Sequence, residues 1–135
     1  MAIIRDVREW QRRPNDYPAV AAPQSVLMAA ADYFNIEEAH NTHMHDANGQ
    51  LQQIDKPLAQ QQWQQLYDSF AASGLNVEVL EAQPDMPDLV FTANPSFIVP
   101  HYRHAWCSKM VHQTRRPEVE VHRRFFEQQG FEIRT

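Results

Sequence analysis

The sequence predicts a single α/β domain, because helical and strand-like patterns alternate along its 135 residues. Two amphipathic helices are expected over residues 57–73 and 117–129, and a glycine followed by a strand-like stretch comes after each. With 43% hydrophobic residues, the chain is large enough for one core and too short for two. We therefore expect an N-terminal arm and linker over residues 1–24 and one domain over residues 25–135.

Composition excludes several classes of protein. A net charge of -5 argues against a general nucleic-acid binder, because little of the surface would attract a phosphate backbone. The single cysteine, Cys107, forms no internal disulfide, which favours a reducing compartment, and the cytoplasm is the expected location. The charged N-terminus, MAIIRDVREWQRR, fits neither a signal peptide nor a membrane span.

The elements of the first half follow from patterning. Ile3, Val7 and Trp10 have helical spacing, which allows a short helix, although an irregular arm fits equally well. Residues 25–30 (SVLMAA) predict a buried strand, and a long polar connection follows it. The helix over residues 57–73 has Asp55 or Lys56 before it and Gly74 after it. Residues 75–80 alternate as an amphipathic strand does.

The second half contains the most apolar stretch of the chain. Residues 86–99 (MPDLVFTANPSFIV) predict one nearly continuous buried strand, in which the polar side chains need partners or a ligand. After a turn near residues 101–104, we expect a strand over residues 105–111. The helix over residues 117–129 ends at Gly130, and the closing FEIRT begins another strand.

The two helix ends indicate an internal repeat. Aligning Gly74 with Gly130 places Phe70 on Phe126 and Leu75 on Phe131, and it places Val77 on Ile133. Helix, glycine and strand is also a common succession in unrelated folds, so the pattern alone leaves both interpretations open. If the repeat is real, the chain stops inside its second unit, and we expect a further C-terminal portion.

Three segments resemble a known superfamily: VLMAAADYFNIEEAHNTHM, MPDLVFTAN and RRPEVEVHRRFFEQQGFEI, of which the second is the most specific. Together they are similar to the N-terminal part of the pentein superfamily of guanidino-group-modifying enzymes, nearest the dimethylarginine dimethylaminohydrolases and amidinotransferase-like proteins. The resemblance implies an α/β fold made of about two ββαβ-type repeats of a pseudo-fivefold propeller. The active site of such a propeller lies in its central channel.

The resemblance also implies site residues and a reaction. A guanidinium is planar and cationic, so carboxylates hold it, and attack on its central carbon needs a nucleophile and a proton donor. Asp88, Phe91 and Asn94 match substrate-binding positions, although many relatives carry an aspartate where Asn94 stands, and some carry a carboxylate in place of Ala93. Glu118 matches the carboxylate that orients a catalytic histidine. That histidine and the nucleophilic cysteine lie in later repeats, so we expect this chain alone to be inactive.

The expected partner is an arginine-like small molecule, without a cofactor, a nucleic acid or a membrane. Exposed sheet edges would also allow copies of the chain to associate as homo-oligomers.

Two alternative functions stay open. One is a non-catalytic domain that binds a small cation or self-associates. The other is a metal site made by His40, His43 and His45 beside Asp46, which are suitable ligand types for zinc, although solvated histidines explain the cluster more simply. Cys107 is expected to be a small buried thiol rather than a nucleophile.

Overall fold

The computed structural model of the chain describes residues 22–135, and two units in which a helix links parallel strands form its framework. In the first unit α1 connects the parallel strands β1 and β2, and in the second α2 connects β4 to the parallel strand β5. β3 pairs with β4 in the antiparallel direction. The bounds are β1 Ser25–Ala29, α1 Lys56–Ala72, β2 Asn76–Leu80, β3 Ser96–Val99, β4 His104–Cys107, α2 Arg116–Gln128 and β5 Glu132–Arg134. The α/β class expected from the sequence is confirmed.

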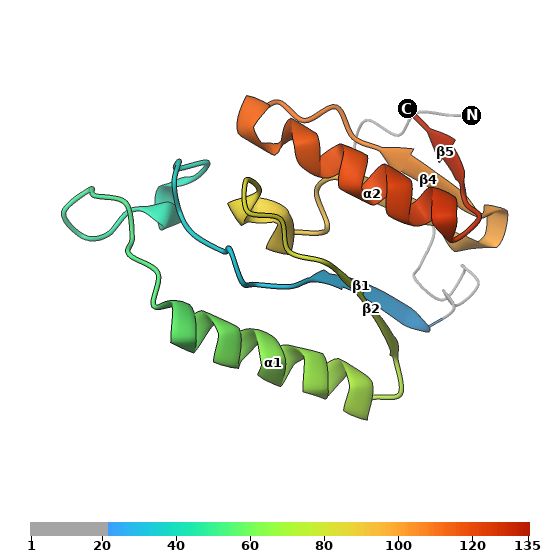
Figure 1. Ribbon diagram of the computed structural model, residues 1–135, viewed down its shortest axis with the longest axis horizontal. Helices are drawn as coiled ribbons and strands as arrows, with labels where there is room; N and C mark the ends of the chain where they lie inside the picture. The colour runs from blue at the N-terminus through green and yellow to red at the C-terminus, as the bar shows by residue number, and fades with distance from the viewer. Residues whose placement is uncertain (1–21) are drawn as a thin grey trace, which may run out of the picture.

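The two helices flank the strands, as Figure 1 shows, with α1 along one side and α2 along the other. The core between the units consists of Ala29, Leu80 and Leu89, against which Val121 and Phe125 of α2 pack. The indole N–H of Trp63 in α1 donates to the carbonyl oxygen of Ala29 at 2.7 Å, so α1 is tied to the C-terminal end of β1. Within residues 22–135, no helix is both long and apolar enough to cross a bilayer.

The repeated helix ends have the same geometry. Gly74 and Gly130 have φ values of 80° and 76°, in the left-handed region that favours glycine. The next backbone N–H bonds back to the helix in both units, from Leu75 to Phe70 and from Phe131 to Phe126. The positions that the sequence aligns are therefore equivalent in the structure.

The prediction of one continuous strand over residues 86–99 is wrong. Residues Pro87–Val90 form a 3-10 helix, η4, and turns lead from it to β3, which begins only at Ser96. Pro87 and Pro95 lack the N–H that a central strand needs. Local hydrogen bonds replace the ladder, from the N–H of Leu89 to Met86 and from the N–H of Phe91 to Asp88.

One further strand boundary differs from the expectation, and one predicted element lies outside the described residues. The strand predicted over residues 105–111 ends at Cys107. The N–H of Ser108 still donates to the carbonyl of Pro95, but Pro95 has no N–H to return the bond, so the pairing of β3 with β4 stops there. The N-terminal helix or arm proposed around Ile3, Val7 and Trp10 lies outside the described residues and stays a prediction.

His122 fixes α2 to β3 through a buried polar contact. Its ring is 0% exposed, and its Nδ1 lies 2.9 Å from the hydroxyl oxygen of Ser96. Burial, and secondly the charge of Arg115, lower the pKa of His122 to about 4. Its Nε2 has no hydrogen-bond partner among the described residues, so a proton there would be buried without an acceptor.

Replacing either helix-ending glycine by alanine should lower the stability of the chain, by different amounts at the two sites. Gly74→Ala should destabilise the chain by about 1 kcal/mol, because an L-residue is strained at this φ. Gly130→Ala should destabilise it more. The new Cβ would lie 3.1 Å from Nη2 of Arg103, whose guanidinium is held by the carbonyls of Gln129 and Gly130, whereas nothing lies within 4 Å at Gly74. Urea denaturation of both variants measures the difference, and equal losses would contradict the close approach of Arg103.

The lowered pKa of His122 predicts loss of stability in acid. Because the unfolded chain binds the proton first, the free energy of unfolding should fall by about 3 kcal/mol as the pH drops from 6.5 to 4. In His122→Gln this part of the pH dependence should vanish, while in the exposed control His101→Gln it should remain. Urea denaturation across this pH range tests the assignment, which an unchanged slope in His122→Gln would refute.

Candidate functional site

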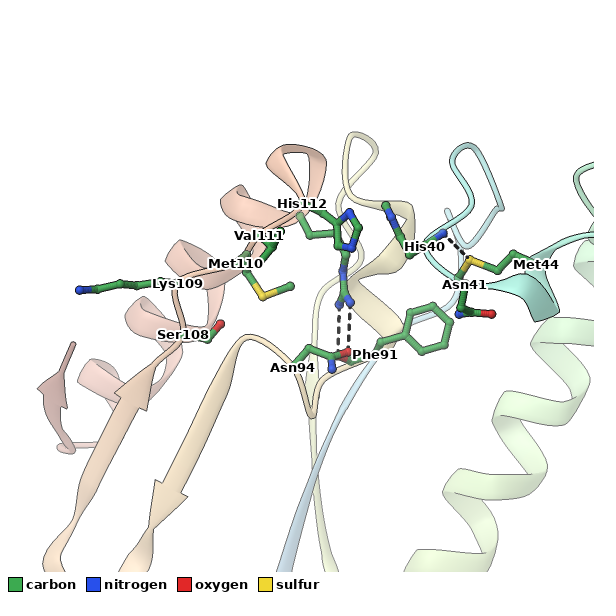
Figure 2. Close-up of a pocket in the computed structure, with 11 residues that line it drawn as sticks. His40, Asn41, Met44, Phe91, Asn94, Ser108, Lys109, Met110, Val111 and His112 are labelled. Atoms are coloured by element: carbon green, nitrogen blue, oxygen red, sulfur yellow. Dashed lines mark hydrogen bonds between the residues drawn. The ribbon is translucent and has the colours of Figure 1, made fainter.

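A cavity of about 490 Å³ lies beside the turns between η4 and β3. The segment after β1 forms part of its wall, and the segment after β4 forms another part. Figure 2 shows His40 and His112 together above Phe91 and Asn94, with Met44 on one side and Met110 on the other. The lining residues are His40, Asn41, Met44, Phe91, Asn94, Ser108, Lys109, Met110, Val111, His112 and Arg115.

Arg115, just before α2, forms the central ion pair of this region. Its Nε donates to one carboxylate oxygen of Glu118 at 2.9 Å, and its Nη2 donates to the other at 2.7 Å. The two residues are 8% and 1% exposed, so the pair is buried. The Arg-Arg-x-Glu sequence places the pair at positions i and i+3 of the helix start, where such side chains are neighbours.

The same guanidinium gathers the other predicted site residues. Nη1 donates to the amide oxygen of Asn94 at 3.0 Å, and Nη2 lies 3.3 Å from the carbonyl of Asp88 and 3.4 Å from that of Phe91. The guanidinium carbon lies 5.7 Å from the centre of the Phe91 ring. The residues proposed from the sequence do surround a guanidinium. In this structure, however, that guanidinium is the side chain of Arg115 and not a ligand.

The carboxylate of Asp88 is held by a different partner. Its Oδ2 lies 3.0 Å from Nε2 of His40, and the two side chains are 12% and 10% exposed. The His40 ring also packs on that of His112, with 4.1 Å between ring centres. Asp88 itself does not line the cavity, whereas His40 does. Reasoning from the sequence missed both His40 in this role and Arg115.

Glu118 was predicted to orient a histidine from outside the chain. Among residues 22–135 both of its oxygens are occupied by Arg115. His122, one turn further along α2, bonds to Ser96 instead. The role of Glu118 toward a catalytic histidine therefore stays a prediction, and its contact in this structure is the positioning of Arg115.

The three histidines considered as metal ligands are not arranged as a site. His40 faces Asp88, whereas His43 and His45 are exposed, and within the described part of the chain no three His, Cys, Asp or Glu side chains are grouped to hold a metal. Asp46 accepts hydrogen bonds from the backbone N–H groups of Asn48 and Gln50, and these bonds lower its pKa. Asp46 thus stabilises its own loop.

Cys107 is buried in β4, as the sequence predicted for a small structural thiol. Burial raises the pKa of this thiol, so the reactive thiolate is disfavoured. Cys107 is also absent from the lining of the cavity. The geometry therefore gives it no contact with a ligand there.

Comparison with known proteins identifies the relatives of the chain. The family described as N,N dimethylarginine dimethylhydrolase, eukaryotic, matches residues 30–134. The bifunctional arginine dihydrolase/ornithine cyclodeaminase AgrE of Nostoc sp. is 27% identical over 107 residues, which are 79% of this chain and 14% of that protein. The dimethylarginine dimethylaminohydrolase of Mycobacterium tuberculosis is 38% identical over 45 residues, or 33% of this chain and 15% of the relative.

Solved structures agree with this assignment. AgrE in complex with L-arginine superposes with a TM-score of 0.70 at 27% identity, over 79% of this chain and 15% of that one. The N-terminal domain of the cyanobacterial arginine dihydrolase ArgZ, bound to product, shares the fold with a TM-score of 0.70 at 24% identity, over 79% of this chain and 37% of that domain. The chain thus spans well under two thirds of the proteins that it matches. It belongs to the N,N-dimethylarginine dimethylhydrolase family, within the pentein superfamily of guanidino-modifying enzymes, and corresponds to the N-terminal part of such enzymes.

Proposed function

We propose that this chain supplies the guanidino-binding wall of a cysteine-dependent hydrolase or amidinotransferase that acts on an arginine-like small molecule. The observation that carries the proposal is the buried carboxylate of Asp88 immediately behind a cavity of about 490 Å³. A guanidinium at this wall would be held by the Asp88 carboxylate, with the Phe91 ring and the Asn94 amide beside it. The oxygen of Asn94 accepts one bond from Arg115 and has a second lone pair for a substrate N–H.

The cavity also suits the other end of an arginine-like molecule. Arg115 and Lys109 line it and are cationic, so a carboxylate several bonds away from the guanidinium is attracted to the same space. The buried pair with Glu118 keeps Arg115 oriented while one hydrogen of its Nη1 remains for a ligand. A zwitterionic substrate with a guanidinium at one end fits this distribution of charge.

The reaction itself needs groups that the described cavity does not present. A thiolate would attack the central guanidinium carbon to form a thiouronium intermediate, the C–N bond would break, and a proton donor would neutralise the leaving amine. Water then completes a hydrolysis, and an amine completes a transfer. The only cysteine of the sequence, Cys107, is buried with a raised pKa, so we place the nucleophile and its histidine outside this chain, with Glu118 as the residue that orients that histidine.

We also propose that the two helix-and-strand units are two modules of a pentein propeller. Two units with equivalent helix ends and parallel strands agree with about two of the five modules of a pentein propeller. In that arrangement the cavity would face the central channel, where residues from outside this chain would meet it.

A second candidate function is a non-catalytic domain that binds a small cation or self-associates. The observation that favours it is the free face of the sheet formed by β3, β4 and β5. Phe97 and Trp106 pair across β3 and β4 and are 69% and 46% exposed, while Ala105 and Cys107, on the alternate face, are buried.

The proposal predicts that L-arginine binds to the chain through Asp88. Asp88→Asn should weaken binding about tenfold or more, because the amide removes the charge that strengthens the hydrogen bonds. Asp85→Asn, an exposed aspartate in the same segment, should leave the affinity unchanged. Isothermal titration calorimetry of the three proteins measures the effect.

Equal affinities for Asp88→Asn and the unmodified chain would contradict the proposed wall. The same preparations should release no citrulline from L-arginine. Turnover that disappears in Cys107→Ser would show that the nucleophile lies within this chain after all.

A further inference from the structure

We propose that His40 is a gate residue on Asp88. In the structure it separates the Asp88 carboxylate from the cavity, and a guanidinium group has to displace it in order to bind. This inference rests on the proposed function, since it concerns how the same carboxylate is reached.

His40 lies between the cavity and the carboxylate of Asp88. His40 lines the cavity and Asp88 does not, although the two side chains are joined by a contact of 3.0 Å. A carboxylate only accepts hydrogen bonds, so the donor is Nε2–H of His40. The Asp88 side chain is 12% exposed, which leaves little surface for a ligand while His40 stays in place.

The mobile member of this pair is His40 rather than Asp88. Asp88 lies in η4, its neighbour Leu89 is 1% exposed in the core, and its carbonyl accepts from Arg115. His40 lies in the long connection between β1 and α1. The regular structure of that connection is one 3-10 turn at Thr42–Met44 and one isolated bridge between His45 and Leu51. Moving the His40 side chain therefore disturbs no helix or strand, and besides the bond to Asp88 it breaks the ring contact with His112.

The closed position also leaves His40 incompletely bonded. Its Nδ1 is buried and has no hydrogen-bond partner among the described residues. Its backbone N–H reaches only the sulfur of Met44, at 3.3 Å, and a thioether is a weak acceptor. The neighbouring ring of His112 is exposed, so a displaced His40 has solvent within reach. Opening thus restores hydration to a polar atom, which offsets part of the lost contact with Asp88.

A guanidinium is suited to take the place of His40. The imidazole gives Asp88 a single hydrogen bond, whereas a guanidinium gives two parallel bonds and a full positive charge. Because only the open fraction of molecules binds ligand, the closed gate lowers the apparent affinity by that fraction. Removing the His40 side chain should therefore strengthen binding, whereas a residue that merely positioned Asp88 would weaken binding when removed.

The test compares L-arginine binding to the unmodified chain, His40→Ala and the matched control His43→Ala by isothermal titration calorimetry. His40→Ala should bind about tenfold tighter, the order expected for loss of a competing hydrogen bond to a charged group. His43 is an exposed histidine of the same loop that does not line the cavity, so His43→Ala should match the unmodified chain. Circular dichroism checks that each variant is folded, and His40→Val replaces His40→Ala if the alanine variant is not.

The outcomes separate the gate from the proposed function. If the unmodified chain binds L-arginine and the His40 variant binds it equally or more weakly, the gate is overturned and the guanidino wall stands. An equal gain in His43→Ala would assign the effect to the loop as a whole and also overturn the gate. If L-arginine binds to none of the folded proteins, the proposed function fails, and the gate fails with it.

Discussion

The buried ion pair between Arg115 and Glu118 is the interaction on which the geometry of the site depends. Arg115 uses one guanidinium to hold the start of α2, the carbonyl groups around η4 and the amide of Asn94. Removing one member of a buried pair costs about 3–5 kcal/mol, because the remaining charge is left without a partner. Both side chains are therefore needed to maintain the geometry of this wall, whichever ligand it binds.

The arrangement of the strands decides where that wall lies. β1 and β4 each run parallel to a partner, and the segments after their C-terminal ends contribute His40 and the stretch from Ser108 to His112 to the cavity. Ligands in open α/β sheets bind outside the carboxyl ends of strands, where connecting loops leave a crevice. The core of Ala29, Leu80 and Leu89 holds both units behind the crevice, so the loops are mounted on a packed support.

The regular elements were predicted from local signals: periodicity and a terminal glycine for each helix, alternation for β2, a short apolar run for β1 and the repeated helix end for β5. It failed over residues 86–99, where apolar content suggested a strand while two prolines and the local bonds of η4 prevented one. It named Asp88, Asn94 and Glu118 as candidate site residues but not Arg115, which contacts all three. Arg115 was visible in the Arg-Arg-x-Glu spacing, whereas the contact of His40 with Asp88 joins residues 48 positions apart, and no local pattern predicts such a pair.

We propose that Asp88 binds an incoming guanidinium while Arg115 stays on Glu118 as part of the wall. A crystal structure of this chain with L-arginine distinguishes this arrangement from the alternatives. We expect the ligand guanidinium within hydrogen-bond distance of the Asp88 carboxylate, His40 rotated away, and the pair of Arg115 and Glu118 intact. A ligand guanidinium seated on Glu118 with Arg115 displaced, or bound away from Asp88, would contradict it.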